Sequence, residues 1–249
     1  TQVFGAITVP SAALAPDGNH EEGGTVSRVG SNEALGGTNV GRMQSYGEAG
    51  DPASLYNAMN TVAKMLTGLG FILDLALVAD VSGGRTDNVI GSRSFGTDPE
   101  LCASMVSVAL SGLQDNGIVS CLKHFPGYGS ATVDDHNGTS IVEKTLDELE
   151  SCDLVPFQSI IAQEGSVPFV MVTHLSYPNV TGSDTPADLS SAIVTDILRD
   201  KLGYQNVIIT DSQSTHSTYQ IFTYCGGAQG HSSAYEQVHA GLDLLSMVS

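Results

Sequence analysis

Basic residues are scarce in this sequence. Only 9 of its 249 residues are Lys or Arg, against 27 Asp and Glu, and the net charge is −18. An acidic surface of this kind repels nucleic acid and anionic lipid, and no basic patch offsets it. The charge balance therefore argues against both as partners. No apolar run approaches the roughly 20 residues that a transmembrane helix requires, so we expect no membrane span in this chain.

Several other signals are missing as well. No Pro/Ser-rich linker, low-complexity tract or short-period repeat divides the sequence, so we expect residues 1–249 to form a single domain. The four cysteines show no C-x-x-C spacing, which argues against a zinc site or a thioredoxin-like motif. The sequence starts at Thr1 without a basic segment followed by an apolar one, so no targeting signal is visible.

What the sequence does contain is an alternation of apolar strands and capped helices, which begins after a weakly structured stretch at 1–50. The connections between the strands are too long for hairpins, so parallel strands are expected. A doubly wound sheet would share this pattern, but no G-x-G-x-x-G follows the first clear strand. Strands are predicted at 71–79, 117–122, 167–172 and 207–210, and helices at 51–66, 97–114, 145–163, 189–202 and 232–239.

Polar side chains stand at the carboxyl ends of these strands. Asp80 follows the first, Lys123 and His124 the second, His174 the third and Asp211 the fourth. In α/β barrels this end carries the chemistry, and about 250 residues suffice for one such barrel. The pattern therefore favours an α/β barrel.

The densest group of ionisable side chains lies between residues 120 and 136. An apolar run leads into Lys123 and His124, after which a proline and two glycines fix unusual backbone angles. Acid and base groups, among them Asp134 and His136, follow at the far end of this loop. A polar surface loop after an edge strand is the simpler alternative, but so many ionisable groups within one loop point to a functional site.

Four segments in order carry recognisable motifs. They are I-G-S-R-S-F-G-T-D-P-E at 90–100, K-H-F-P-G-Y-G at 123–129 with D-x-H at 134–136, I-T-D at 209–211 and A-G-x-D at 240–243. Together they resemble family 3 glycoside hydrolases, specifically the bacterial β-N-acetylglucosaminidase branch. The resemblance covers most of the chain and implies a (β/α)8 TIM-type barrel. The first strand and the closing helix are poorly represented, so we expect a barrel that is incomplete at both termini.

The resemblance implies an activity and a set of roles. The expected enzyme is a retaining glycoside hydrolase without metal or cofactor, in which a carboxylate attacks the anomeric carbon and an acid/base group serves the leaving group. It would remove terminal non-reducing β-linked N-acetylglucosamine from cell-wall or chitin-type oligosaccharides through a covalent glycosyl-Asp intermediate. Asp211 would be the nucleophile and His136, oriented by Asp134, the acid/base; Arg93, Lys123, His124, His174 and Asp80 would bind the substrate.

Some positions depart from the family pattern or allow a simpler interpretation. His20 stands where the family usually has an Asp that grips the sugar, and Gln213 occupies a normally apolar position. Glu21 and Glu22 are expected to be acidic surface. Arg93 could also tie its loop to Asp98, and His174 could be a satisfied core histidine.

Other functions stay open on the sequence alone. The departures at His20 and after Asp211 allow a sugar-binding barrel that has lost catalysis. A metal-dependent hydrolase is a further alternative, with His124, His136, His174 and Asp211 as ligands. Phosphate could replace water in the second step of the glycosidase reaction. The localisation also stays open, because related proteins occur in the bacterial cytoplasm and at the cell surface.

Overall fold

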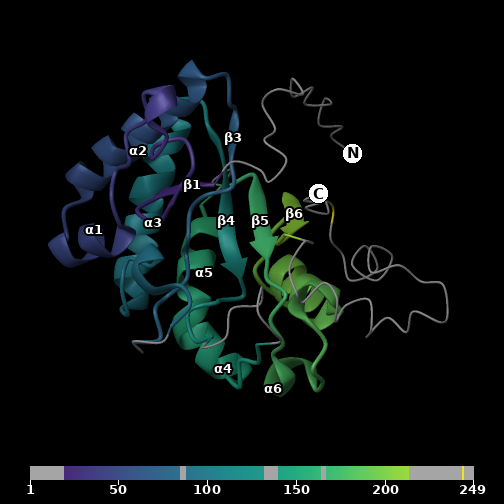
Figure 1. Ribbon diagram of the computed structural model, residues 1–249. Coiled ribbons are helices and arrows are strands. Elements are labelled where there is room, and N and C mark those ends of the chain that lie inside the picture. The colour runs from purple at the N-terminus through teal and green to yellow at the C-terminus, as the bar shows by residue number, and fades with distance from the viewer. Residues whose placement is uncertain (1–19, 85–87, 132–139, 164–166, 213–242, 244–249) are drawn as a thin grey trace.

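Four parallel strands form the central sheet of the protein (Figure 1). The computed structural model describes residues 20–84, 88–131, 140–163, 167–212 and 243. Strand order follows chain order, β3-β4-β5-β6, so consecutive strands are neighbours with helices between them. This is the arrangement that the spacing of apolar runs predicts. The strands are β3 (Leu73–Asp74), β4 (Val119–Phe125), β5 (Phe169–Val172) and β6 (Val207–Thr210).

Helices connect the strands and cover one side of the sheet (Figure 1). The main ones between strands are α3 (Pro99–Gln114), the series α4 (Leu146–Glu148), η3 (Leu149–Asp153) and α5 (Val155–Ile161), and the π-type helix η5 (Ala192–Lys201). α2 (Pro52–Gly68) precedes β3 and packs against α3. The shorter elements are β1 (Glu21–Gly23), β2 (Val26–Ser27), η1 (Glu33–Leu35), α1 (Met43–Ala49), η2 (Gly91–Arg93), α6 (Pro178–Thr181) and η4 (Ala187–Leu189).

Three helices begin at the residues that the sequence predicts, whereas the helix expected at 189–202 begins at Ala192. Asp51 accepts hydrogen bonds from the first turn of α2, and Asp98 does the same for α3, each followed by a proline in the first turn. Thr145 and Glu148 form the predicted capping box at the start of α4. Local capping chemistry therefore determines where these helices start.

Both faces of the sheet are apolar. Leu122 of β4 belongs to the large core that fills the space beneath the helices. Its neighbour Cys121 points to the opposite face, where it packs with Leu75, Met171 and Ile209 in a separate cluster. A strand buried on both faces has a nearly continuous apolar sequence, which is why these strands are conspicuous in the sequence.

The predicted strand boundaries need two corrections. The strand expected at 71–79 is limited to β3, because Leu77 has φ +106°, a backbone conformation that interrupts a strand. Val78 then pairs with Lys123 in an isolated bridge. In the second strand, β4 continues to Phe125, so Lys123 and His124 lie within the strand and not after it.

The helix predictions also need corrections. The helix expected at 145–163 is three successive segments, with a π-type turn at η3 and a proline, Pro156, in the first turn of α5. Within 1–50, α1 and the β1–β2 hairpin have regular structure that the sequence did not predict. α1 has no side-chain cap at Arg42, so the usual start signal is absent. The helix predicted at 232–239 lies outside the described residues.

A buried carboxyl group joins β3 to β1. Asp74 Oδ1 accepts a hydrogen bond from the backbone N–H of Glu21 at 3.0 Å, and Oδ2 has no partner among the described residues. Burial raises the pKa of Asp74 to about 7, with Glu21 and Glu22 adding to the rise, against the Glu21 N–H and the charge of Lys123. The folded pKa exceeds the unfolded value of about 3.9. The stabilisation is therefore full below pH 4 and is lost as pH rises through 7.

Asp74→Asn is expected to raise the free energy of unfolding at pH 8 by about 2–4 kcal/mol and to change it little at pH 4. The amide keeps the shape of the side chain and the acceptor for Glu21 but cannot ionise. Urea unfolding at the two pH values measures the difference. Asp200→Asn, at an exposed position, is the matched control and should show no such pH dependence. An equal effect of Asp74→Asn at both values would contradict the assignment.

Candidate active site

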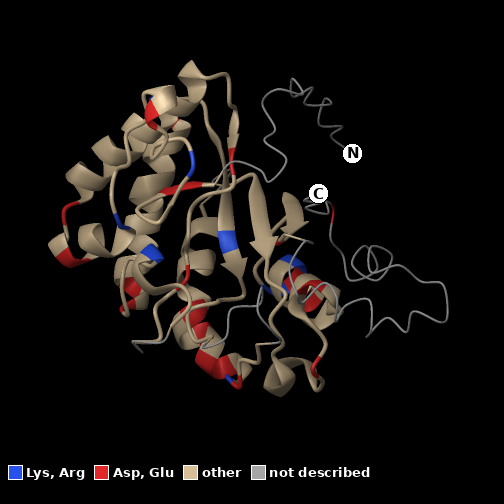
Figure 2. Ribbon diagram, viewed as in Figure 1, with Lys and Arg blue, Asp and Glu red and all other residues tan. Residues whose placement is uncertain are grey.

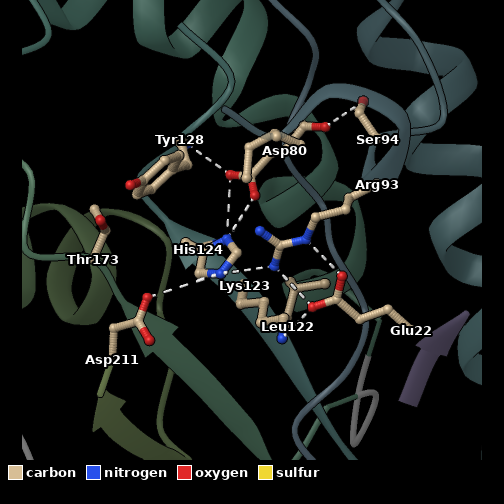
Figure 3. Close-up of polar contacts among 12 residues, drawn as sticks. Glu22, Asp80, Arg93, Ser94, Leu122, Lys123, His124, Tyr128, Thr173 and Asp211 are labelled. Carbon is tan, nitrogen blue, oxygen red and sulfur yellow. Dashed lines mark hydrogen bonds and ion pairs between the residues drawn. The ribbon is translucent and has the colours of Figure 1, made fainter. Parts of the chain in front are cut away.

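The polar side chains predicted at the strand ends meet at the carboxyl end of the sheet (Figure 3). Lys123 and His124 come from β4, and Asp211 directly follows β6. Arg93 reaches the same place from η2, and Glu22 reaches it from β1. Parallel strands bring their carboxyl ends to one edge, so residues far apart in the sequence become neighbours there.

Glu22 holds two cations at the floor of this site. Its Oε1 lies 2.6 Å from Lys123 Nζ, and Arg93 donates to both carboxylate oxygens at 2.7 and 2.8 Å. The side chains of Glu22 and Lys123 are almost fully buried. Burial alone would raise the pKa of Glu22, but Lys123 and Arg93 outweigh it and hold this pKa well below its usual range. The cations are thus fixed in position by a buried, ionised carboxylate.

This cluster corrects one expectation. Glu22 and its neighbour Glu21 are buried, not acidic surface. Glu21 accepts hydrogen bonds from Ser27 and from the backbone of 29 and 30. The two glycines after the pair were a usable signal, because Gly23 has φ +89° and a side chain there would lie 2.5 Å from the Gly41 carbonyl oxygen. Arg93, predicted to bind the substrate, pairs with Glu22, and not with Asp98 as in the simpler alternative.

His124 is oriented by Asp80. The Asp80 carboxylate lies 2.7 Å from His124 Nδ1 and also accepts the backbone N–H of Tyr128 at 2.6 Å. Because the carboxylate only accepts, Nδ1 carries the proton. Nε2 then faces the site, 3.8 Å from Asp211 Oδ2 and 3.5 Å from Arg93 Nη2. Asp80 therefore fixes the ring of His124 and the start of the following loop.

Asp211 carries the negative charge at the centre of the site. Its backbone N–H bonds to the Val172 carbonyl at 2.9 Å, which extends the strand pairing, and its Oδ1 accepts the Ser212 N–H at 2.7 Å. Burial raises its pKa, but His124, His174, the Ser212 N–H and Lys123 together lower it to about 2. The carboxylate is therefore ionised at any working pH.

His174 lies next to the segment that carries Asp211. Its Nδ1 lies 3.1 Å from Asp188 Oδ2, and its Nε2 lies 3.1 Å from the Ser212 carbonyl oxygen. Both side chains of this pair are buried. The contact with Ser212 ties His174 to the segment that carries Asp211. Asp188 gave no signal in the sequence, because it lies in a short turn, η4, without a motif.

The loop after β4 is anchored near both of its ends. Gly127 has φ +140°, and Gly129 approaches the Val81 carbonyl so closely that a Cβ would lie 1.7 Å from it. On the far side, the Val142 N–H bonds to the Ser176 carbonyl at 2.8 Å. Asp134 and His136, the predicted acid/base pair, lie between these anchors and outside the described residues.

Three further features of the described residues bear on possible partners. No three His, Cys, Asp or Glu side chains among them are arranged to hold a metal ion. No helix there is long and apolar enough to cross a membrane. A blue segment marks a basic residue within β4 in Figure 2, whereas the red acidic segments lie mainly over the helices.

Comparisons with known proteins assign the fold. The family model described as the glycosyl hydrolase family 3 N-terminal domain matches residues 16–249. The chain belongs to glycosyl hydrolase family 3. It is 38% identical over 184 residues to the β-hexosaminidase LpqI of Mycobacterium tuberculosis, which covers 74% of this chain and 45% of that protein. The chain thus spans less than half the length of this relative.

Solved structures of family 3 enzymes share the architecture. The β-N-acetylglucosaminidase from Paenibacillus sp. FPU-7 is 34% identical with a TM-score of 0.79, over 92% of this chain and 41% of that one. NagZ from Neisseria gonorrhoeae, in complex with N-trifluoroacetyl-D-glucosamine, is 30% identical with a TM-score of 0.76, over 92% and 63%. The predicted family and its TIM-type barrel fold are confirmed. The described strands and helices form part of such a family 3 barrel.

Proposed function

We propose that this family 3 chain is a single catalytic barrel domain, residues 1–249, of a retaining glycoside hydrolase that removes terminal non-reducing β-linked N-acetylglucosamine. The observation that carries the proposal is the ionised Asp211 at a strand end, 3.8 Å from His124 and backed by buried cations. A rigid carboxylate in such a place suits attack on an anomeric carbon.

The reaction follows from these positions. An Asp211 oxygen forms a bond to the anomeric carbon while the bond from that carbon to the leaving-group oxygen breaks, and the acid/base group protonates that oxygen. Water then attacks the anomeric carbon of the glycosyl ester and gives a proton to the same acid/base group. The bond from that carbon to Asp211 breaks, which releases the carboxylate. By resemblance, His136 held by Asp134 is this group. A histidine titrating near neutral pH can donate in the first step and accept in the second.

The remaining polar groups bind the sugar. Arg93 and Lys123 keep N–H groups beyond those that Glu22 accepts, and His124 presents Nε2 to the site. They hydrogen-bond the hydroxyl and acetamido groups of a terminal N-acetylglucosamine, with Asp80 and His174 holding His124 and the Asp211 segment in place. The name of the mycobacterial relative and the glucosamine derivative bound to NagZ support this sugar class. Cell-wall and chitin-type oligosaccharides both carry it.

Hydrolysis of an aryl β-N-acetylglucosaminide tests the proposal. We expect turnover that chelator does not reduce, with the β-anomer as the first sugar product by NMR, because two displacements at one carbon retain its configuration. Binding of N-acetylglucosamine without turnover would favour the barrel that has lost catalysis. Loss of activity with chelator, restored by a divalent ion, would favour the metal-dependent hydrolase. Initial release of the α-anomer would contradict the assignment of Asp211 as nucleophile.

A further inference from the structure

His20 extends the cation cluster of the active site outward. Its Nδ1 lies 2.9 Å from Lys123 Nζ, and it directly precedes β1, whose Glu22 pairs with the same Nζ. Lys123 is fully buried, whereas His20 is half-buried. The contacts therefore lead from two buried side chains, Glu22 and Lys123, to the more exposed His20.

Chemistry fixes the direction of this hydrogen bond. An ammonium group donates and cannot accept, so Nδ1 of His20 accepts from Lys123. A neutral imidazole has one donor and one acceptor nitrogen, so its proton is on Nε2. The Lys123 charge and burial lower the pKa of His20 to about 3, against smaller opposing effects of Asp211 and Glu22. The ring is therefore neutral, with one fixed tautomer, at any pH where a glycosidase works.

The Nε2–H of His20 is available for a ligand. Among the residues that the structure describes, it has no hydrogen-bond partner. His20 Nδ1 lies 2.9 Å from Nζ of Lys123, one of the groups proposed to bind the sugar. A sugar held by Lys123 therefore lies beside a donor that the described protein leaves unused.

We propose that His20 is a specificity-determining residue, which donates its Nε2–H to an acceptor on the sugar bound against Asp211. The inference rests on the proposed function. A carboxylate in this place would only accept, and would require an O–H on the substrate. His20 requires only a lone pair. The substrate class therefore includes sugars in which the facing hydroxyl is etherified or replaced by another acceptor.

Binding of aryl 1-thio-β-N-acetylglucosaminides separates hydrogen-bond polarity from turnover, because thioglycosides resist hydrolysis. Deoxyfluoro and deoxy analogues at C3, C4 and C6 are compared by calorimetry, since fluorine accepts but does not donate and hydrogen does neither. At one position, we expect the wild type to bind the deoxyfluoro analogue roughly two- to tenfold more tightly than the deoxy analogue. Equal affinities at all three positions would overturn the proposal.

Two variants complete the test. In His20→Asn, Oδ1 takes the place of Nδ1 and still accepts from Lys123, but no donor reaches the position of Nε2, so the preference for the deoxyfluoro analogue should be lost. In His20→Asp, the carboxylate repels fluorine, and the deoxyfluoro analogue should bind no better than the deoxy one. An unchanged order in a folded His20→Asp would overturn the proposal; if that variant does not fold, the wild-type series decides. Turnover of the matching O-glycoside is measured separately. Absence of turnover would contradict the proposed function, whereas the binding series tests only the role of His20.

Discussion

Asp211→Asn is expected to lower kcat/KM for an aryl β-N-acetylglucosaminide by roughly 10⁴-fold or more. The amide has the shape of the carboxylate but cannot form the glycosyl ester. It also removes the charge that His124, His174 and Lys123 stabilise. The loss should appear in kcat, because the carboxylate acts on the anomeric carbon in the transition state. Steady-state kinetics with an activated aryl leaving group measures it.

Chemical rescue gives a sharper readout for the same residue. With Asp211→Ala, azide can enter the space of the missing carboxylate and attack the anomeric carbon directly, giving an α-glycosyl azide by one inversion. A purely structural role of Asp211 would give no such product. Asp196→Asn, at an exposed position on η5, is the matched control and should keep full activity. Activity of Asp211→Asn within tenfold of the wild type would exclude Asp211 as nucleophile.

Glu22→Gln is expected to destabilise the protein by about 3–5 kcal/mol, because removing one partner of a buried ion pair leaves an uncompensated charge. Here the charges left behind are Lys123, which is fully buried, and Arg93. Activity should fall as well, because Glu22 fixes both cations in the site. Urea unfolding at neutral pH measures the change in stability.

The effect of Glu22→Gln should depend on pH in one direction. The folded pKa of Glu22 is depressed, so its stabilisation is present above the unfolded value of about 4.3 and is lost as pH falls through the folded value. The difference between wild type and variant should therefore shrink as pH falls below 4.

Matched variants separate the ion pair from packing. Glu48→Gln, at an exposed position on α1, should change stability by less than about 0.5 kcal/mol. The double variant Glu22→Gln/Lys123→Met should recover part of the loss, because the fully buried cation is then gone. A cost of Glu22→Gln below 1 kcal/mol would contradict the buried cluster.

Local chemistry made much of the fold and part of the site predictable. Asp51, Asp98 and Thr145 mark helix starts because a capping side chain acts within about three residues of itself. The apolar strands were recognisable because both faces of the sheet are buried. Strand ends placed Lys123, His124 and Asp211 at one edge, since parallel strands share that edge. The order of the motifs identified the family.

Contacts between segments that are distant in the sequence could not be predicted from local patterns. Glu22 reads as surface charge in the sequence, and only its approach to Arg93, 71 residues away, makes it the buried anion of the site. Asp80 meets His124 across 44 residues. Lys123 and Arg93 lower the pKa of Glu22, and His124 and His174 contribute most to lowering that of Asp211, so both shifts depend mainly on residues distant in the sequence.

The sequence by itself determined the order of strands and helices, the helix starts, the family and the strand-end position of Asp211. The tertiary structure alone decided which carboxylate holds which cation, that His174 pairs with Asp188, and that His20 accepts from Lys123. The physical reason is range. Capping and periodicity act over a few residues of chain, whereas charge pairing and burial depend on which segments the fold brings together.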